Sequence, residues 1–438
     1  MKNTILHIIA FVLFSNTSFA QTPLPAPPQT EAIVLIGGIA HLGNGELIEN
    51  SIIGFDKGVI TFVGDARSDQ DLSGYKKIDI TGKHIYPGFI LPNSALGLDE
   101  IAAVQASVDK SEVGTMNPNI RSVIAYNTDS KIIATLRFNG VLIAETTPAG
   151  GRISGTSSVM NLDGWNWEDA ALKMDIGIHM SWPNRMRWNF NEATWSYALE
   201  DNKNYSSDVE EITSFFDDAI SYSRQSTKDR NMKLEAMRGL FSGEKILFIS
   251  VDGSKEIIES VRFAQKMGVV KIVINSGTGI GALDVAPFLV ENKIPVILNK
   301  IHSLPSNGDM NLNTPFKLPY LLSQAGVSVS LSHFDGAMSA RNLPFYAGTA
   351  ITYGVAKEEA VKMLTLNPAM ALGIDKEVGS LEIGKRATFF VSDGDALDMR
   401  TNNLVLAYID GKKIELNNEQ HDLYERYTKK YSEEKTEY

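Results

Sequence analysis

The sequence predicts an α/β protein, a (β/α)8 TIM barrel combined with a small β-sandwich domain that both ends of the chain form. Three observations lead to this fold class. The chain has 438 residues, of which 43% are hydrophobic, enough to bury one large core with a smaller one beside it. Apolar strand-like runs alternate with helical segments in the middle of the chain. Short β-rich segments precede and follow this alternation.

The first β-rich segment covers residues 31–85. Residues 32–36, 51–55 and 59–63 are rich in β-branched side chains, and Gly and Asp separate these runs. This pattern predicts short strands joined by turns, and therefore a small β-sheet module.

The barrel is expected over residues 86–378, with its first strand reaching back to residue 84. Several of its strands are continuous apolar runs, as in parallel strands buried on both faces. The clearest helices are residues 209–241 and 255–267, with apolar side chains at helical spacing. Eight such units predict a barrel with right-handed crossovers throughout. The expected strands are residues 84–90, 140–145, 153–160, 173–180, 245–250, 271–275, 295–299 and 327–332.

The chain returns to short strands after a helix predicted over residues 358–371. Residues 384–391 and 404–409 are expected to rejoin the N-terminal sheet, so that 31–85 and 379–416 form one composite β-sandwich domain. Residues 417–438 form a charged tail, which we interpret as a solvated helix.

The first 20 residues have the pattern of a signal peptide. Lys2 gives the positive start, residues 5–14 are apolar apart from His7, and Ser18 and Ala20 are the small residues that a signal peptidase reads. The alternative is a membrane anchor, but the apolar run is too short to cross a bilayer. We therefore expect a periplasmic or secreted protein without membrane association after cleavage. Residues 21–30, rich in Pro, are expected to be a disordered lead.

Composition excludes several functional classes. The net charge of −11 argues against nucleic acid or an anionic membrane as the main partner, because both require a basic surface. The chain contains no cysteine, which excludes thiol catalysis and thiolate metal sites.

Three motifs resemble those of a known enzyme superfamily. Residues 86–98 read Y-P-G-F-I-L-P-N-S-A-L-G-L, residues 364–373 read L-T-L-N-P-A-M-A-L-G, and residues 379–387 read G-S-L-E-I-G-K-R-A. They are similar to the P-G-x-I-D-x-H-x-H, T-x-N-P-A-x-x-L-G and G-S-I-x-x-G-K-x-A-D signatures of the amidohydrolase superfamily, near its imidazolonepropionase-like exported members. The resemblance implies a hydrolase acting on carbon–nitrogen bonds other than peptide bonds.

The same resemblance implies a zinc ion or another divalent metal, held by histidines at strand ends and by an Asp at strand eight. Such an ion supplies hydroxide by lowering the pKa of bound water to about 7. In this sequence Asn93 and Ala95 occupy the paired histidine positions, Ser250 stands at the strand-five histidine, and Asn275 ends strand six without a histidine. Ala has no lone pair, and neutral Asn and Ser are weak zinc ligands. We therefore predict no metal cofactor and no metal-ligand residues.

Residual candidates for catalysis are His333 and Asp335, because a His–carboxylate pair can orient a general base. The alternative for this pair is a purely structural role. Candidate substrate-binding residues near predicted strand ends are Asn93, Glu145, His179, Ser250 and Arg341. Arg341 has two interpretations, a clamp for a substrate carboxylate or a residue that holds the loop after strand eight.

Two further features have open alternatives. The glycine-rich residues 150–156 are interpreted as a loop that shapes the pocket or as an anion-binding nest. Five tryptophans between residues 165 and 195 form a subunit interface or loop core, or else a ligand wall.

The main functional hypothesis is a degenerate amidohydrolase that lacks the catalytic metal and acts as a partner or binder. Its partner would be an active amidohydrolase paralogue or a second copy of the chain, and a small molecule would occupy the barrel mouth. The alternative is an active hydrolase of small amides or dipeptide-like substrates, with a displaced metal or a metal-free site. A third hypothesis is a periplasmic small-molecule binding protein. Fold alone does not choose among them.

Overall fold

The computed structural model describes residues 24–192, 195–224, 229–305, 308–334 and 336–434. The predicted signal peptide lies outside these ranges. Residues 24–30 have no regular secondary structure, but Ala26 is buried and its backbone N–H donates to Asp163 Oδ2 at 3.1 Å. This part of the expected disordered lead is therefore held against the body of the protein.

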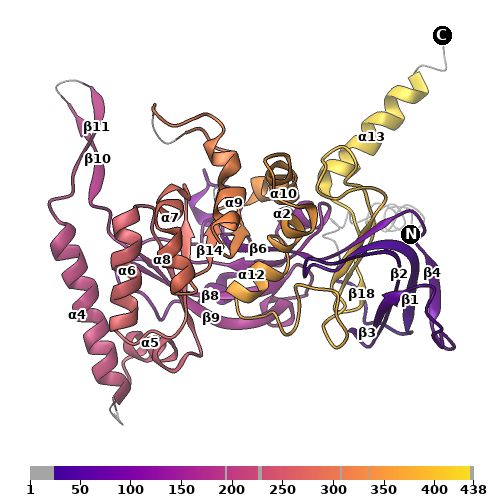
Figure 1. The fold of residues 1–438 in the computed structure, drawn as a ribbon, viewed down its shortest axis with the longest axis horizontal. Coiled ribbons are helices and arrows are strands. Elements are labelled where there is room, and N and C mark those ends of the chain that lie inside the picture. Colours follow the sequence, from indigo (N-terminus) through magenta and orange to yellow (C-terminus); the bar gives the residue numbers. More distant parts are fainter. Residues whose placement is uncertain (1–23, 193–194, 225–228, 306–307, 335, 435–438) are drawn as a thin grey trace, which may run out of the picture.

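Both ends of the chain meet in one β-sheet (Figure 1). Strand β16 pairs antiparallel with β5 on one side and with β17 on the other, which joins the C-terminal segment to the N-terminal one. The sheet packs on a core that includes Phe55, Phe389 and Tyr408, whose rings contact one another at centroid distances of 4.9–5.2 Å. Its strands are β1 (Ile33–His41), β2 (Leu47–Asp56), β3 (Val59–Asp65), β4 (Lys76–Asp79), β5 (His84–Pro87), β16 (Phe389–Ser392), β17 (Leu404–Ile409) and β18 (Lys412–Lys413).

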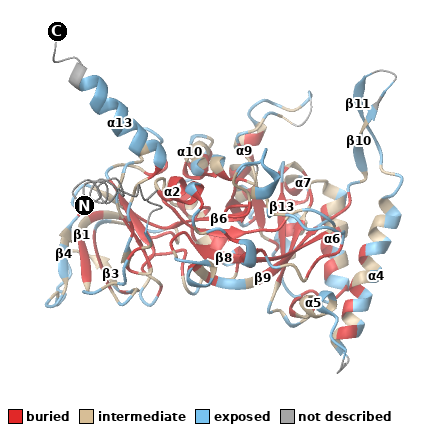
Figure 2. Cartoon of the chain, turned by 180° about the vertical axis from the view of Figure 1, so that it is seen from behind, coloured by how far each residue is buried: buried red, intermediate tan, exposed pale blue. Residues whose placement is uncertain are grey.

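A second eight-stranded sheet forms the barrel, and its strands follow one another in chain order. The first and last strands approach each other, since the Ser332 hydroxyl donates to the Pro92 carbonyl. Most residues of these strands are buried (Figure 2), but Lys173, Met174 and Ser181 on the fourth strand are exposed. They are β6 (Phe89–Ser94), β7 (Val141–Thr146), β8 (Ile153–Asn161), β9 (Ala171–Ser181), β12 (Ile246–Ser250), β13 (Ile272–Ser276), β14 (Val296–Leu298) and β15 (Val329–Leu331).

One strand differs from the sequence prediction of right-handed crossovers throughout. Strand β8 runs antiparallel to both β7 and β9, whereas the other neighbouring pairs are parallel. The connection from β7 to β8 covers only residues 147–152. A parallel crossover needs a dozen or more residues, so this short loop can only make a reversal.

The first predicted strand, residues 84–90, is divided between the two sheets. Residues 84–87 form β5, and the barrel strand β6 begins at Phe89. Gly88 lies between them, and a Cβ at this position would lie 2.9 Å from Leu142 Cβ and 3.1 Å from Thr388 Cγ2. The change of sheet therefore depends on a glycine.

Helices cover the outside of the barrel (Figure 1). The predicted helix over 209–241 is two helices, α4 and α5, and the one over 358–371 is divided at Thr365 into α11 and α12. The predicted tail helix is α13. The helices are α2 (Lys131–Arg137), α3 (Trp167–Ala170), α4 (Tyr205–Arg224), α5 (Met232–Ser242), α6 (Ser254–Lys266), α7 (Ile280–Asp284), α8 (Ala286–Glu291), α9 (Thr314–Gln324), α10 (Leu343–Thr352), α11 (Lys357–Lys362), α12 (Leu366–Ala371) and α13 (Glu419–Glu434), with 3-10 turns η1 (Gln105–Ser107), η2 (Ser122–Ala125) and η3 (Ala337–Asn342).

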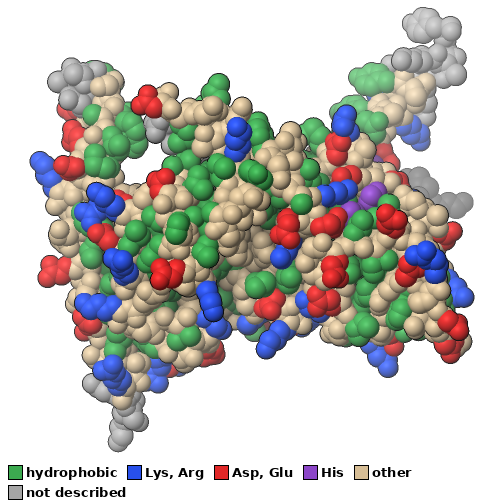
Figure 3. Space-filling view, in the orientation of Figure 1, with side chains coloured by type: hydrophobic (Ala, Val, Ile, Leu, Met, Phe, Trp, Pro, Cys, Tyr) green, Lys and Arg blue, Asp and Glu red, His purple; other side chains and the backbone are tan. Residues whose placement is uncertain are grey.

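A β-hairpin that the sequence did not predict projects from the body between β9 and α4 (Figure 1). It consists of β10 (Met186–Asn191) and β11 (Ser196–Asp201). Trp188 and Trp195 on this arm are 66% and 84% exposed, while Trp182 at its base is buried. Figure 3 shows hydrophobic side chains on the surface of this arm. The five tryptophans of the sequence are therefore not one cluster: Trp182 is buried, Trp188 and Trp195 lie on the exposed arm, and Trp165 and Trp167 lie before and at the start of α3.

No helix in the part of the chain that the structure describes has both the length and the apolar character needed to cross a bilayer.

Candidate functional site at the barrel mouth

The carboxyl ends of the barrel strands surround a cavity of about 380 Å³. The ends of parallel barrel strands are the usual position of a site in this architecture. Three of the predicted substrate-binding residues, Asn93, His179 and Ser250, line the cavity. Its other polar lining groups come from Thr147, Ser154, Ser181, Asn184, Asp252, Asn275 and Asn299.

The fourth predicted residue, Glu145, lies beneath the cavity and is fully buried. Its Oε2 accepts a hydrogen bond from the Asn93 backbone N–H at 2.7 Å. Its Oε1 accepts one from the Ser157 hydroxyl at 2.7 Å and lies 3.0 Å from His179 Nε2. Because burying a carboxylate is costly unless it is hydrogen-bonded, these three contacts are what allow Glu145 to sit there.

Asn93 has a left-handed backbone conformation, with φ at +48°. The pairing of β6 with β7 shifts register between Leu91 and Ser94, so the strand bulges at this point. Asn accepts positive φ better than most residues. The bulge directs the Asn93 N–H to Glu145, and the side-chain Nδ2 donates to Asn299 Oδ1 at 2.7 Å. Asn93 therefore links strand one of the barrel to the end of strand seven.

His179 is held on two sides. Its Nε2 contacts Glu145 Oε1 and the Ser157 hydroxyl, the latter at 2.9 Å, and its ring stacks on Phe248 at a centroid distance of 4.6 Å. Phe248 has room because Gly177 lies beside it, where a Cβ would come within 2.4 Å of the ring. A His held in this way beside a carboxylate has the arrangement of an oriented general base.

Asn275 is the most distinctive polar group of the cavity. It is 1% exposed, and neither its Oδ1 nor its Nδ2 has a hydrogen-bond partner among the described residues. Buried amide groups nearly always have partners, because an unmade hydrogen bond costs about 1–3 kcal/mol. This side chain therefore presents one donor and one acceptor to whatever enters the cavity.

The residues of the mouth do not fit the metal ion that the superfamily resemblance implies. Within the described ranges, no three His, Asp or Glu side chains are grouped so that they could hold a metal ion. Both oxygens of Glu145 already accept hydrogen bonds from the protein, and the Asn93 amide is engaged with Asn299. Asp252 accepts hydrogen bonds from the Ser276 hydroxyl and the Thr278 backbone N–H, and so orders the loop after β13.

The remaining predicted residues are not brought into the cavity. The Arg341 guanidinium contacts the Met338 carbonyl at 3.5 Å, and its own carbonyl accepts from Asn139, so it holds the loop after strand eight. His333 is buried, and its Nδ1 lies 2.6 Å from the Tyr346 hydroxyl. Asp335, the proposed partner of His333, lies outside the described residues.

Near His333 lies a second histidine, His302. Its Nε2 lies 2.7 Å from the Thr349 hydroxyl and its ring packs edge-on against Tyr346. Burial, and then the nearby His333, lower the pKa of His302. The two histidines belong to the packing of α10 against the barrel.

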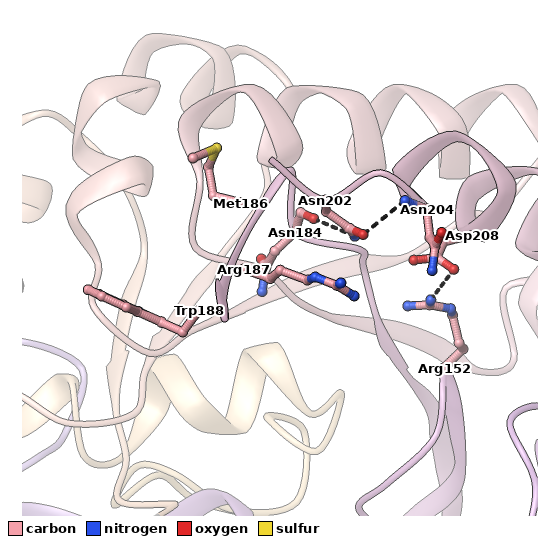
Figure 4. Close-up of a pocket in the computed structure, with 8 residues that line it drawn as sticks. All are labelled: Arg152, Asn184, Met186, Arg187, Trp188, Asn202, Asn204 and Asp208. Atoms are coloured by element: carbon pink, nitrogen blue, oxygen red, sulfur yellow. Dashed lines mark hydrogen bonds and ion pairs between the residues drawn. The ribbon is translucent and has the colours of Figure 1, made fainter. Parts of the chain in front are cut away.

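A second pocket, of about 450 Å³, opens at the base of the β10–β11 hairpin (Figure 4). Arg152 extends into it and is held by Asp208 at 2.5 Å. The Asn202 side chain donates to the Asn184 carbonyl at 2.9 Å, which fixes the opposite wall. Asn184 lines both this pocket and the barrel mouth. Residues 150–156 thus contribute to the walls of both pockets through Gly150, Arg152 and Ser154.

Sequence reasoning missed Ser157, Asn299 and Asp252. Asn299 is the last residue of one predicted strand and Asp252 lies two residues beyond another, so a search of every strand end for polar residues would have found them. Ser157 lies in the middle of β8, and its approach to Glu145 depends on the antiparallel direction of that strand.

Comparison with known proteins supports one superfamily. The family model described as amidohydrolase family matches residues 315–414. An N-substituted formamide deformylase from Arthrobacter pascens is 37% identical over 103 residues, which are 20% of this chain and 19% of that protein. An imidazolonepropionase from Syntrophobacter fumaroxidans is 39% identical over 69 residues, 16% of each chain. The alignments therefore span less than a quarter of the length of these curated relatives.

The fold is shared over a much longer stretch. The crystal structure of an amidohydrolase from Thermotoga maritima superposes with a TM-score of 0.76 and covers 87% of this chain and 99% of that one, at 21% sequence identity.

Proposed function

We propose that this protein, which belongs to the amidohydrolase superfamily, binds a small amide-containing molecule at its barrel mouth without a catalytic metal ion. The observation that carries the proposal is the Asn275 side chain, whose donor and acceptor are both buried and have no partner among the described residues. A planar carbonamide offers the complementary acceptor and donor.

The rest of the mouth supports the same ligand class. Its described polar lining consists mainly of amides and hydroxyls, with Asp252 as the acidic member and no Lys or Arg. Neutral groups of this kind favour a neutral polar ligand, because a charged ligand would lose its hydration without gaining a counter-ion. The volume of about 380 Å³ suits a small molecule or a dipeptide-like one.

Metal content is the first test. The purified mature protein is loaded with zinc or manganese, desalted and analysed by elemental mass spectrometry. We expect less than about one metal per ten chains, because neutral Asn and Ser are weak ligands for zinc. One tightly held metal per chain would contradict the proposal and would direct attention to the region of His333 and Asp335.

Ligand binding is tested with a simple amide. N-acetylglycinamide is titrated into the protein by calorimetry, and Asn275→Leu, which keeps the side-chain volume but removes both polar atoms, is expected to weaken binding about tenfold. An equal affinity in the two proteins, or no binding to either, would contradict the assignment. Asn402→Leu, far from the mouth, is the matched control.

We also propose a partner role, either with an active amidohydrolase paralogue or as a homo-oligomer. The exposed aromatic residues of the β10–β11 arm support it, because isolated hairpins with one apolar face gain stability from being covered. Sedimentation of the wild-type protein and of a Trp188→Ser variant, with and without an envelope amidohydrolase, tests this role; a monomer under all conditions would argue against it.

A second candidate function is metal-free hydrolysis of small amides, favoured by the His179–Glu145 pair at the cavity. In that case amide hydrolysis would persist in excess EDTA and fall at least 100-fold in His179→Gln. Hydrolysis that EDTA abolishes, or that His179→Gln leaves unchanged, would exclude this mechanism.

A further inference from the structure

We propose a second ligand site, for an amphipathic anion such as a medium-chain carboxylate, at the opposite end of the barrel from the mouth. The site is a cavity of about 990 Å³. It lies at the amino ends of the strands, since Ile246 begins β12, Ile272 begins β13, and Pro295 and Ser328 immediately precede β14 and β15. Catalytic sites of such barrels lie at the other face, so this cavity calls for a separate explanation. The proposal goes beyond the function proposed for the mouth and does not depend on it.

The floor of this lower cavity is apolar. Buried side chains from the strands and from α8 form it, with Leu289 fully buried and Ile272 and Ile294 each 7% exposed. Three further apolar side chains lie at its edge with much of their surface in solvent, Val270 at 59%, Met370 at 56% and Val290 at 40%. Exposed apolar groups gathered around a concave apolar floor are typical of a binding surface.

The rim of the lower cavity is basic, although the whole chain carries a net charge of −11. Lys173, Lys271, Lys293 and Lys376 line it, against a single acidic residue, Asp375. The Lys173 ammonium is engaged with the Gly373 carbonyl at 2.8 Å. No ion pair or side-chain hydrogen bond within the described ranges involves the other three lysines.

These two properties together define the ligand. An apolar floor would accept a hydrocarbon chain, whose transfer out of water is favourable. A basic rim with few acidic neighbours would attract one negative charge at the end of that chain. A neutral lipid would leave the lysines without a counter-ion, and a small inorganic anion would leave the apolar floor exposed. A single-chain carboxylate satisfies both parts of the site.

The test compares two probes that differ only in charge, decanoate and N-methyldecanamide, each below its aggregation limit. Binding is followed by calorimetry and by the methyl signals of ¹³C-labelled methionine, with the Met370 signal identified from a Met370→Leu variant. We expect decanoate to bind at least tenfold more tightly than the amide and to shift the Met370 methyl signal. Equal affinities, or binding that leaves this signal in place, would overturn the proposal.

Two exposed-residue variants separate the charge from the apolar floor. Lys271→Glu with Lys293→Glu should reduce decanoate affinity at least tenfold and change that of the amide less than twofold. Val270→Asp should weaken both probes. The control, Lys429→Glu with Lys430→Glu on exposed α13, makes the same change in net charge and should leave both affinities unchanged; an equal loss in this control would reduce the effect to overall charge and refute the site. Binding to anionic vesicles but not to monomeric decanoate would likewise refute it, in favour of a membrane surface.

Discussion

Replacing Glu145 with alanine is expected to lower the free energy of unfolding by about 3–5 kcal/mol, a large share of the stability of an ordinary domain. The carboxylate accepts hydrogen bonds from the Asn93 backbone and the Ser157 hydroxyl and contacts His179 Nε2, all of them in buried residues. The Asn93 N–H would then be left without its acceptor beneath the cavity. Each buried group without a partner costs about 1–3 kcal/mol, and the deleted side chain also leaves a void.

The measurement is urea unfolding at pH 7, followed by circular dichroism. Glu145→Gln is expected to lose less than Glu145→Ala, since its carbonyl oxygen can still accept one bond and its volume is retained. Glu425→Ala serves as the control, because this side chain is 68% exposed and its pair with His421 should contribute less than about 1 kcal/mol. If Glu145→Ala unfolds at nearly the wild-type urea concentration, the carboxylate does not hold the mouth together.

Such a structural role also affects how the candidate site is tested. A loss of ligand binding in Glu145→Ala would combine unfolding with loss of contact, whereas Asn275 has no partner among the described residues whose loss would disturb the fold. For this reason Asn275→Leu, and not a Glu145 variant, is the informative change for binding at the barrel mouth.

The fold class followed from the sequence because several strands of the barrel are continuous apolar runs and the C-terminal motifs place the return to the sheet. The direction of β8 did not follow from the same information. A strand-like run such as residues 153–160 has the same composition in either direction, and only the six-residue connection before it forbids a parallel crossover. The length of this loop, rather than the residue pattern of the strand, determines the direction of β8.

The site was predictable to the extent that it depends on strand ends. Asn93, His179 and Ser250 line the mouth because each stands near the carboxyl end of a barrel strand. The position of Arg341 could not be predicted in this way. It lies in a 3-10 turn after strand eight, and its position depends on how that loop folds. The side-chain contacts of Glu145 were also hidden, because Ser157 reaches it only across the antiparallel β7–β8 pair.

The residue pattern of the hairpin arm does not match its exposure to solvent. Met186, Trp188 and Phe190 alternate with polar residues on β10, as a half-buried strand would, yet all three are at least 40% exposed. This alternation is typical of a strand whose apolar face is covered by another surface. No part of the described chain supplies that surface, and the sequence left open whether these tryptophans form an interface or loop core or else a ligand wall.

Replacing Arg137 with alanine is expected to cost about 3–5 kcal/mol of unfolding free energy, because it leaves Asp163 buried and without its counter-ion. The guanidinium on α2 donates to Asp163 Oδ1 and to the Leu162 carbonyl, both at 3.2 Å, and the two side chains are only 6% and 3% exposed. Asp163 in turn accepts the Ala26 backbone N–H. The pair therefore fastens α2, the end of β8 and the start of the described chain to one another.

A double variant shows how much of this cost is an uncompensated charge. Arg137→Met with Asp163→Asn removes both charges and keeps an acceptor for the Ala26 N–H. It should recover most of the stability that Arg137→Ala loses, since exchanging a whole buried pair for neutral groups is often nearly neutral. If the double variant is as unstable as Arg137→Ala, the loss comes from packing around α2 and not from the charge.

The pH dependence of the Arg137→Ala deficit provides the independent check. Burial raises the pKa of Asp163 above its usual 3.8, and Arg137 opposes that rise. Without the guanidinium the pKa in the folded state rises further. A raised carboxyl pKa means that the folded protein holds the proton more tightly than the unfolded chain, so its contribution to stability is present at low pH and lost as pH rises through the folded value. The deficit of Arg137→Ala relative to wild type should therefore be largest near pH 7 and shrink as the pH falls toward 4. A deficit that is the same at both pH values would mean that Asp163 is not left charged and buried when Arg137 is removed.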